Sequence, residues 1–180
     1  GTPLVAAYVA LERGRVLRSS GRAEAAGPLF RAALDIALGA GHEHLAADAA
    51  HMLAIIGDAA EQERWARRAL EIAGASADPR ARRWVGPVCN NLGWTLHEQG
   101  RHEEALDLWE RALAAYIERG DPEAVRIARW TVARGLRELG RVQEALAIQE
   151  ELATGPPDPY VDEELALLRG QGTTPGTAEP

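Results

Sequence analysis

The sequence predicts an all-α protein built as a solenoid of stacked helical hairpins. Apolar residues recur at three- and four-residue spacing along almost the whole chain, without the alternation typical of strands. In addition, a helix-ending segment with a leucine four residues before a glycine occurs around Gly21, Gly57, Gly100 and Gly140. These glycines lie 36, 43 and 40 residues apart. One helical hairpin per period of about 20 to 50 residues is the sequence signature of a solenoid.

The apolar periodicity divides the chain into four hairpins and one further helix. Each Asp-Pro pair, at Asp78, Asp121 and Asp158, supplies an N-cap carboxylate followed by a proline suited to the first helical turn. Pro87 lies inside the third long segment, so we expect either a kink there or a short helix stacked on a longer one. The expected hairpins are 3–20 with 23–39, 43–56 with 59–74, 79–99 with 102–119, and 122–139 with 142–153.

The last expected helix, 159–169, carries Val161, Leu165 and Leu168 on one face and acidic residues, including Glu164, elsewhere. A half-repeat of this kind caps the end of a solenoid. We therefore expect one domain over residues 1–169, since a chain of 180 residues fits a single core. Residues 170–180 lack the apolar content needed to fold and are expected to form a disordered tail.

Composition excludes several classes of function. The net charge of −7 argues against a general nucleic-acid binder, and no apolar run reaches the roughly 18 residues of a membrane span. Leu4 to Leu11 is apolar but has no basic segment before it, so we expect no secretion signal and a cytoplasmic protein. Lysine is absent, which excludes a Schiff-base lysine. The single Cys89 excludes an internal disulfide, and its position on an apolar face predicts a buried side chain.

No motif for a phosphate loop, a dinucleotide site, a nucleophile elbow or a zinc-protease helix occurs in the sequence. We therefore expect no enzyme activity, cofactor or resident metal.

The repeat resembles the tetratricopeptide repeat, whose paired helices interlock through small residues. The best match is Asn91-Leu92-Gly93, followed by Leu96, Gly100, Ala105, Trp109 and Ala112. The resemblance implies a right-handed superhelix in which Gly93 lies at the helix crossing and Trp109 fills the core beside it. Gly14 and Phe30 match the same two positions in the first hairpin, whereas Gln149 replaces the aromatic residue in the fourth. The chain is similar to stand-alone bacterial proteins of this family.

In this family a concave groove, lined by the first helix of each hairpin, binds a peptide or protein. Tryptophan and arginine are the most frequent anchors of such interfaces. The alternatives are that Trp94 and Trp130 pack between hairpins and that the arginines are solvated. The resemblance implies these groove residues: Glu12 and Arg15 (with Tyr8 and Arg18 beside them), His44, Asp48, His51, Asn90, Asn91, Trp94, His97, Trp130, Arg134 and Arg137.

His44, Asp48 and His51 form the most unusual group in the sequence. Their spacing places them within an arc of about 60° on one helical face, where Asp48 can hydrogen-bond either histidine. The two histidine backbones lie about 10 Å apart along the axis, so a metal held by both would be strained. Asp48 with one histidine and His97 or Glu12 would hold a metal more easily. A polar groove patch, a metal site and a catalytic site all remain open here.

These observations predict a non-enzymatic scaffold for a peptide or protein segment. Arg15, Arg18, Arg134 and Arg137 favour an acidic or C-terminal carboxylate partner, because guanidinium groups bind carboxylates in two-pronged geometry. The alternative function is a small-molecule or metal-dependent activity at His44, Asp48 and His51. Self-association through the open end of the solenoid is a third possibility.

Overall fold

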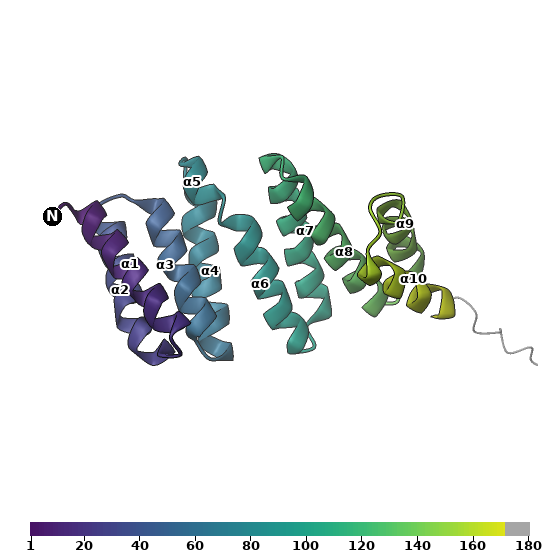
Figure 1. The fold of residues 1–180 in the computed structure, drawn as a ribbon, viewed down its shortest axis with the longest axis horizontal. Coiled ribbons are helices and arrows are strands. Elements are labelled where there is room, and N and C mark those ends of the chain that lie inside the picture. The colour runs from purple at the N-terminus through teal and green to yellow at the C-terminus, as the bar shows by residue number, and fades with distance from the viewer. Residues whose placement is uncertain (172–180) are drawn as a thin grey trace, which may run out of the picture.

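The protein is a row of antiparallel helical hairpins, as Figure 1 shows for the computed structural model. The structure describes residues 1–171, so the expected tail lies outside the described residues except for its first two, which end the last helix. The ten helices of residues 1–171 are α1 (Pro3–Ser19), α2 (Ala23–Gly39), α3 (Glu43–Ile56), α4 (Ala59–Ala75), α5 (Pro79–Arg82), α6 (Val85–Glu98), α7 (His102–Arg119), α8 (Pro122–Glu138), α9 (Val142–Leu152) and α10 (Pro159–Gln171).

The predicted all-α solenoid is confirmed, and its helices begin and end where the sequence indicated. The side chain of Asp121 accepts a hydrogen bond from the backbone N–H of Ala124 at 3.0 Å. Gly100 and Gly140 adopt positive φ angles of 77° and 74° directly after α6 and α8, which a side chain would disfavour. Gly57, which occupies the same position after α3, instead has an extended backbone.

The predicted helix 79–99 is two helices in the structure, the second of the two forms expected from Pro87. The short α5 ends at Arg82, and α6 begins at Val85. Pro87 is the third residue of α6, where its missing N–H costs no hydrogen bond. Further along a continuous helix it would clash with the carbonyl group of Arg83, which explains why the break precedes it.

Each hairpin closes over small residues at the helix crossing, as the family resemblance implied. Trp109 and Phe30 are 1 % and 0 % exposed. A Cβ atom added at Gly93 would come within 3.0 Å of the Trp109 ring, and one at Gly14 would meet Phe30 in the same way. Glycine at these positions therefore sets the close approach of the two helices.

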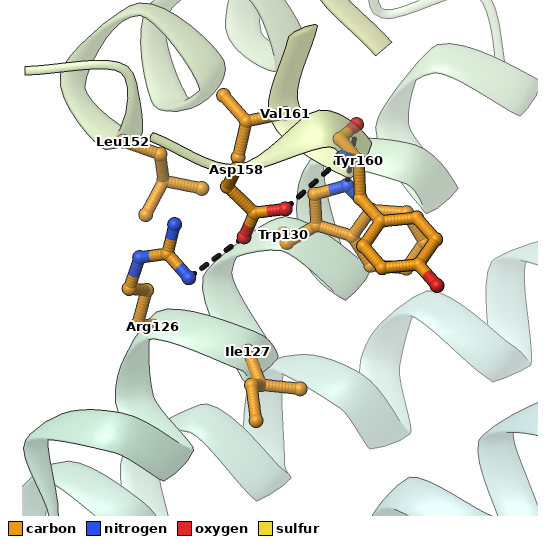
Figure 2. Close-up of a pocket in the computed structure, with 7 residues that line it drawn as sticks. All are labelled: Arg126, Ile127, Trp130, Leu152, Asp158, Tyr160 and Val161. Atoms are coloured by element: carbon orange, nitrogen blue, oxygen red, sulfur yellow. Dashed lines mark hydrogen bonds and ion pairs between the residues drawn. The ribbon is translucent and has the colours of Figure 1, made fainter. Parts of the chain in front are cut away.

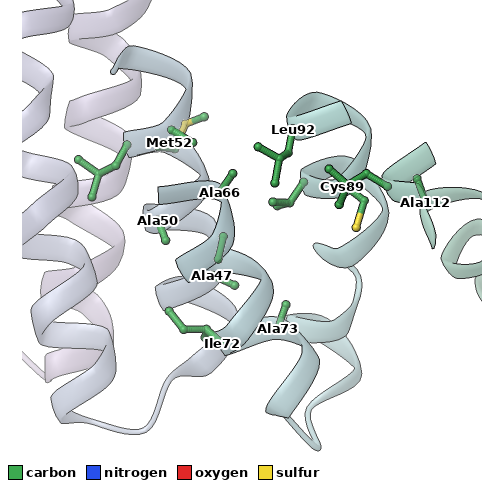
Figure 3. Packing of buried hydrophobic residues seen from close by; sticks show 14 of the residues in the cluster. Ala47, Ala50, Met52, Ala66, Ile72, Ala73, Cys89, Leu92 and Ala112 are labelled. Carbon is green, nitrogen blue, oxygen red and sulfur yellow. The ribbon is translucent and has the colours of Figure 1, made fainter. Parts of the chain in front are cut away.

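The core continues from one hairpin to the next through small and aliphatic side chains. Figure 3 shows Ala66 of the second hairpin on the side facing Leu92 of α6, and Ala50 and Cys89 belong to the same buried cluster. Cys89 is fully buried, as predicted, and burial raises the pKa of its thiol. None of the helices in residues 1–171 is both long and apolar enough to cross a membrane.

The C-terminal helix α10 packs on α9 and α8 through the predicted apolar face, Val161, Leu165 and Leu168. Glu164 was placed away from this apolar face by the sequence, and it is nevertheless only 4 % exposed. Its carboxylate is buried because it pairs with Arg137 of α8, at 2.7 Å from the guanidinium Nε. This ion pair fixes α10 against the fourth hairpin.

Candidate functional site

An apolar pocket opens between α8 and the start of α10 (Figure 2). Its volume is about 270 Å³, and its accessible surface is almost entirely carbon. Ile127 and Tyr160, which line it, are 56 % and 66 % exposed, so both side chains are accessible to a partner. The residues that line the pocket are Arg126, Ile127, Trp130, Leu152, Asp158, Tyr160 and Val161.

Polar contacts hold the walls of this pocket in place. Arg126 pairs with Asp158 at 2.7 Å, and the indole N–H of Trp130 donates to the backbone oxygen of Tyr160 at 3.1 Å (Figure 2). The rings of Trp130 and Tyr160 meet nearly edge to face, 6.1 Å apart. The Nε of Arg126 is buried without a hydrogen-bond partner among the described residues. The pocket is thus preformed and keeps one free donor in its wall.

Arg134 connects the pocket to the preceding hairpin. Its guanidinium carbon lies 5.8 Å from the centre of the Trp130 ring and 5.4 Å from that of Trp94 on α6. Both distances are within the range of a cation–π interaction. Trp94 also packs against the buried Trp109, with ring centres 4.9 Å apart. Three predicted groove residues therefore meet in one half-buried stack, and both tryptophans pack between hairpins while keeping part of their surface accessible.

A cluster of two histidines and one glutamate continues this face of α6 and α8. The Nε2 atom of His97 contacts the Oε2 atom of Glu138, and the Nδ1 atom of His102 lies 3.8 Å from the same oxygen. The two imidazole rings are 5.0 Å apart. Burial acts to raise the pKa of Glu138, but the contacts with His97 and Arg134 outweigh it and lower the pKa.

We define the α6–α8–α10 face by Trp94, His97, Trp130, Arg134, Glu138 and the pocket beside Tyr160. It presents flat aromatic surface, one apolar pocket, imidazole groups that can donate or accept hydrogen bonds, and a carboxylate that accepts them. Such a combination can bind an extended segment by anchoring one apolar side chain and hydrogen-bonding its backbone.

The predicted group of His44, Asp48 and His51 does not come together. Asp48 accepts two hydrogen bonds of 2.6 Å from Arg15, which Glu12 also contacts, so the expected hydrogen bond from Asp48 to a histidine is wrong. His44 lies 3.6 Å from Asp78, at the start of α5. Burial and then Arg80 lower the pKa of His44. Asp48 pairs with Arg15 instead of a histidine because the guanidinium group of Arg15 reaches it from the neighbouring helix α1.

His51 is a core residue, not an open groove residue. It is 6 % exposed, and its ring packs 5.1 Å from that of Trp84, between α5 and α6. Burial, followed by the charges of Arg18 and Arg15, lowers its pKa to about 4. Asp48 is also buried, and burial raises its pKa although Arg15 acts against this. The α5 segment, which packs against α3, covers the face that was predicted to be open.

His51 and the exposed Asn91 do border the same small cavity, of about 230 Å³, between α3, α4 and α6. Trp94 does not line this cavity. The side chain of Asn90 donates a hydrogen bond to that of Asn91 at 3.3 Å. This cavity is smaller and more polar than the pocket beside Tyr160, with Gln62 and Thr95 also in its wall.

The arginines expected to bind a carboxylate partner are mostly paired inside the chain. Arg15 holds Asp48, Arg137 holds the buried Glu164, and Arg134 lies 3.3 Å from Glu138. Their positive charges therefore serve first to join neighbouring helices.

Sequence reasoning missed Ile127, Tyr160, His102 and Glu138. The ring of His102 is half-buried against that of His97. Tyr160 directly follows an Asp-Pro helix start, which was the signal that could have placed it beside α8. Glu138 lies two residues before Gly140 and His97 three residues before Gly100, so the repeat register does not align them and gave no signal for their contact.

Comparison with protein families gives two matches. Residues 88–154 match the model described as tetratricopeptide repeat, and residues 7–77 match a second model of the same description. No curated protein sequence matches the chain.

Comparison with solved structures finds the same architecture at low sequence identity. A structure of Pseudomonas aeruginosa pilF aligns with a TM-score of 0.69 and 22 % identity, covering 96 % of this chain and 71 % of that one. A Podosopora anserina putative kinesin light chain with nearly identical TPR-like repeats also gives a TM-score of 0.69, with 19 % identity, covering 91 % of this chain and 87 % of that one. At this identity the likeness concerns the fold alone.

Proposed function

The chain belongs to the tetratricopeptide repeat family, and we propose that it is a non-enzymatic scaffold that binds a peptide or protein segment on its α6–α8–α10 face. Repeats of this family serve protein–protein interaction, which supports a macromolecular partner. The proposal places the binding centre at the C-terminal half of the solenoid.

The observation that carries the proposal is the preformed apolar pocket between α8 and α10. Its volume of about 270 Å³ lies just below the roughly 300–1,000 Å³ of small-molecule sites. It therefore suits one large apolar side chain of a partner better than a whole metabolite.

The stack of Trp94, Arg134 and Trp130 extends this anchor point along the face. Tryptophan and arginine at the centre of an interface contribute most of its binding energy, because their large flat surfaces are desolvated together. The internal pairing of Arg15 and Arg137 favours an apolar or aromatic segment over the acidic segment expected from the sequence.

The experiment is a selection of peptides from a random display library on the full chain, followed by affinity measurement. Ile127→Glu places a carboxylate at the pocket edge without disturbing a buried side chain, since Ile127 is 56 % exposed. We expect this variant to bind the selected peptide at least about tenfold more weakly, which corresponds to about 1.4 kcal/mol.

Ile117→Glu is the matched control, because Ile117 is 59 % exposed on α7 and lies outside the pocket. It should bind like the wild type. Equal affinity of the two variants, or a library that yields no binder to the wild type, would show that the pocket is not the anchor.

A further inference from the structure

We propose that His97, His102 and Glu138 form a binding site for one divalent transition metal ion of the zinc type. The site shares His97 and Glu138 with the α6–α8–α10 face, but it rests on different observations and would stand if the proposed peptide binding failed. It differs from the metal alternative expected from the sequence, which involved His44, Asp48 and His51. Among residues 1–171, the cluster of His97, His102 and Glu138 is the group with metal-ligand geometry.

The three side chains already bring their donor atoms together. The Nε2 atom of His97, the Nδ1 atom of His102 and a carboxylate oxygen of Glu138 all lie within 4.8 Å of one another. In a tetrahedral zinc site, bonds of about 2.0–2.1 Å place neighbouring donors about 3.3 Å apart. The remaining gap can be closed by small rotations of the side chains, without movement of the helices that carry them.

One donor atom has no other role in the structure. The Nδ1 atom of His102 is buried and has no hydrogen-bond partner among the described residues. A buried polar atom without a partner costs free energy, so it needs an explanation. It lies 3.8 Å from the Glu138 oxygen, which is beyond hydrogen-bond distance but compatible with one ion bonded to both atoms.

The donor set selects the class of metal. Two neutral imidazoles and one carboxylate suit zinc and its neighbours in the first transition row, whereas magnesium and calcium prefer oxygen ligands. Three protein ligands leave a fourth position open to water or to a side chain of a partner.

The surroundings support the carboxylate ligand but also add positive charge. The second oxygen of Glu138 accepts a hydrogen bond from Arg134 at 3.3 Å, and such outer contacts orient metal-bound carboxylates. Arg137 lies 3.9 Å from the same oxygen, but its charge is compensated by Glu164. Arg134 also stacks on Trp94 and Trp130.

A bound ion would connect three helices. His97 lies near the end of α6, His102 begins α7, and Glu138 ends α8. The metal would therefore fix the Gly100 turn of the third hairpin against the fourth hairpin, next to the tryptophan and arginine stack.

The test is a titration of the tag-free, EDTA-treated full chain with zinc by calorimetry and with Co²⁺ by visible absorption. We expect one ion per chain and the intense absorption of tetrahedral Co²⁺. His102→Gln and Glu138→Gln should each weaken zinc affinity at least about tenfold, because each removes one of three ligands. His42→Gln is the control: His42 is also half-buried and lies at the start of a helix, α3, but is outside the cluster.

The proposal would be overturned by absence of zinc binding to the wild type, by octahedral Co²⁺ absorption alone, or by wild-type affinity in both ligand variants. An equal loss in His42→Gln would also overturn it, since binding would then not depend on the cluster. Melting temperatures measured in EDTA establish that the variants are folded. If a ligand variant does not fold, the Co²⁺ spectrum of the wild type decides.

Discussion

The burial of His51 predicts a specific loss of stability in mild acid. Its pKa falls from 6.5 to about 4 in the folded protein, because burial and then the charges of Arg18 and Arg15 disfavour the imidazolium form. Above about pH 6.5 the histidine is neutral in both states, and its contribution is fully present. As the pH falls from about 6.5 to about 4, the unfolded chain binds a proton that the folded chain does not, so the folded state loses stability.

The magnitude follows from the size of this pKa difference. Each pKa unit corresponds to about 1.4 kcal/mol, so lowering the pKa from 6.5 to about 4 gives about 3 kcal/mol. Urea unfolding at about pH 7 and about pH 4 should show that the wild type loses about 3 kcal/mol more than His51→Leu, which cannot titrate. Other ionisable groups are shared by both proteins and cancel in this comparison.

Identical pH dependence in the wild type and His51→Leu would refute the reasoning. It would mean that the imidazole is protonated in the folded state, and hence that it is solvated or paired with a carboxylate. The predicted His44, Asp48 and His51 patch would then deserve renewed consideration.

Three further predictions concern packing. Gly93→Leu should lower the free energy of unfolding by about 2 kcal/mol, because the leucine side chain would overlap the Trp109 ring. An unchanged urea midpoint would contradict the close approach of the two helices at Gly93. Gln149→Leu should raise stability by about 1–3 kcal/mol, since both polar atoms of this fully buried side chain lack hydrogen-bond partners among the described residues; a lower melting temperature would contradict this. Cys89 should react with a bulky thiol reagent only at the rate of unfolding, and fast stoichiometric labelling of the native protein would disprove its burial.

The fold could be predicted because its determinants are local. Asp-Pro pairs set helix starts, glycines with positive φ set the turns, and small residues such as Gly93 set the helix crossings. Each of these acts within a few residues or within one hairpin, so a repeated sequence pattern shows it directly.

The site was harder to predict because it depends on contacts between hairpins. The alignment of the repeats placed Trp94, Trp130 and Arg134 on one face, where they do meet. It could not show that Asp48 pairs with Arg15 or that α5 covers His51. The break before Pro87 turns the short α5 toward α3, and a repeat pattern contains no information on that direction. The cytoplasmic location, the single-domain division and self-association stay predictions.

The most direct measurement of the central claim is amide hydrogen exchange of the full chain with and without a display-selected peptide. The account predicts slower exchange around Ile127 and Trp130 on α8 and around Tyr160 on α10, where the pocket opens. The outer helices α2 and α4 should exchange at unchanged rates. Protection confined to the first two hairpins, with none on α8 and α10, would contradict the claim that the pocket beside Tyr160 anchors the partner.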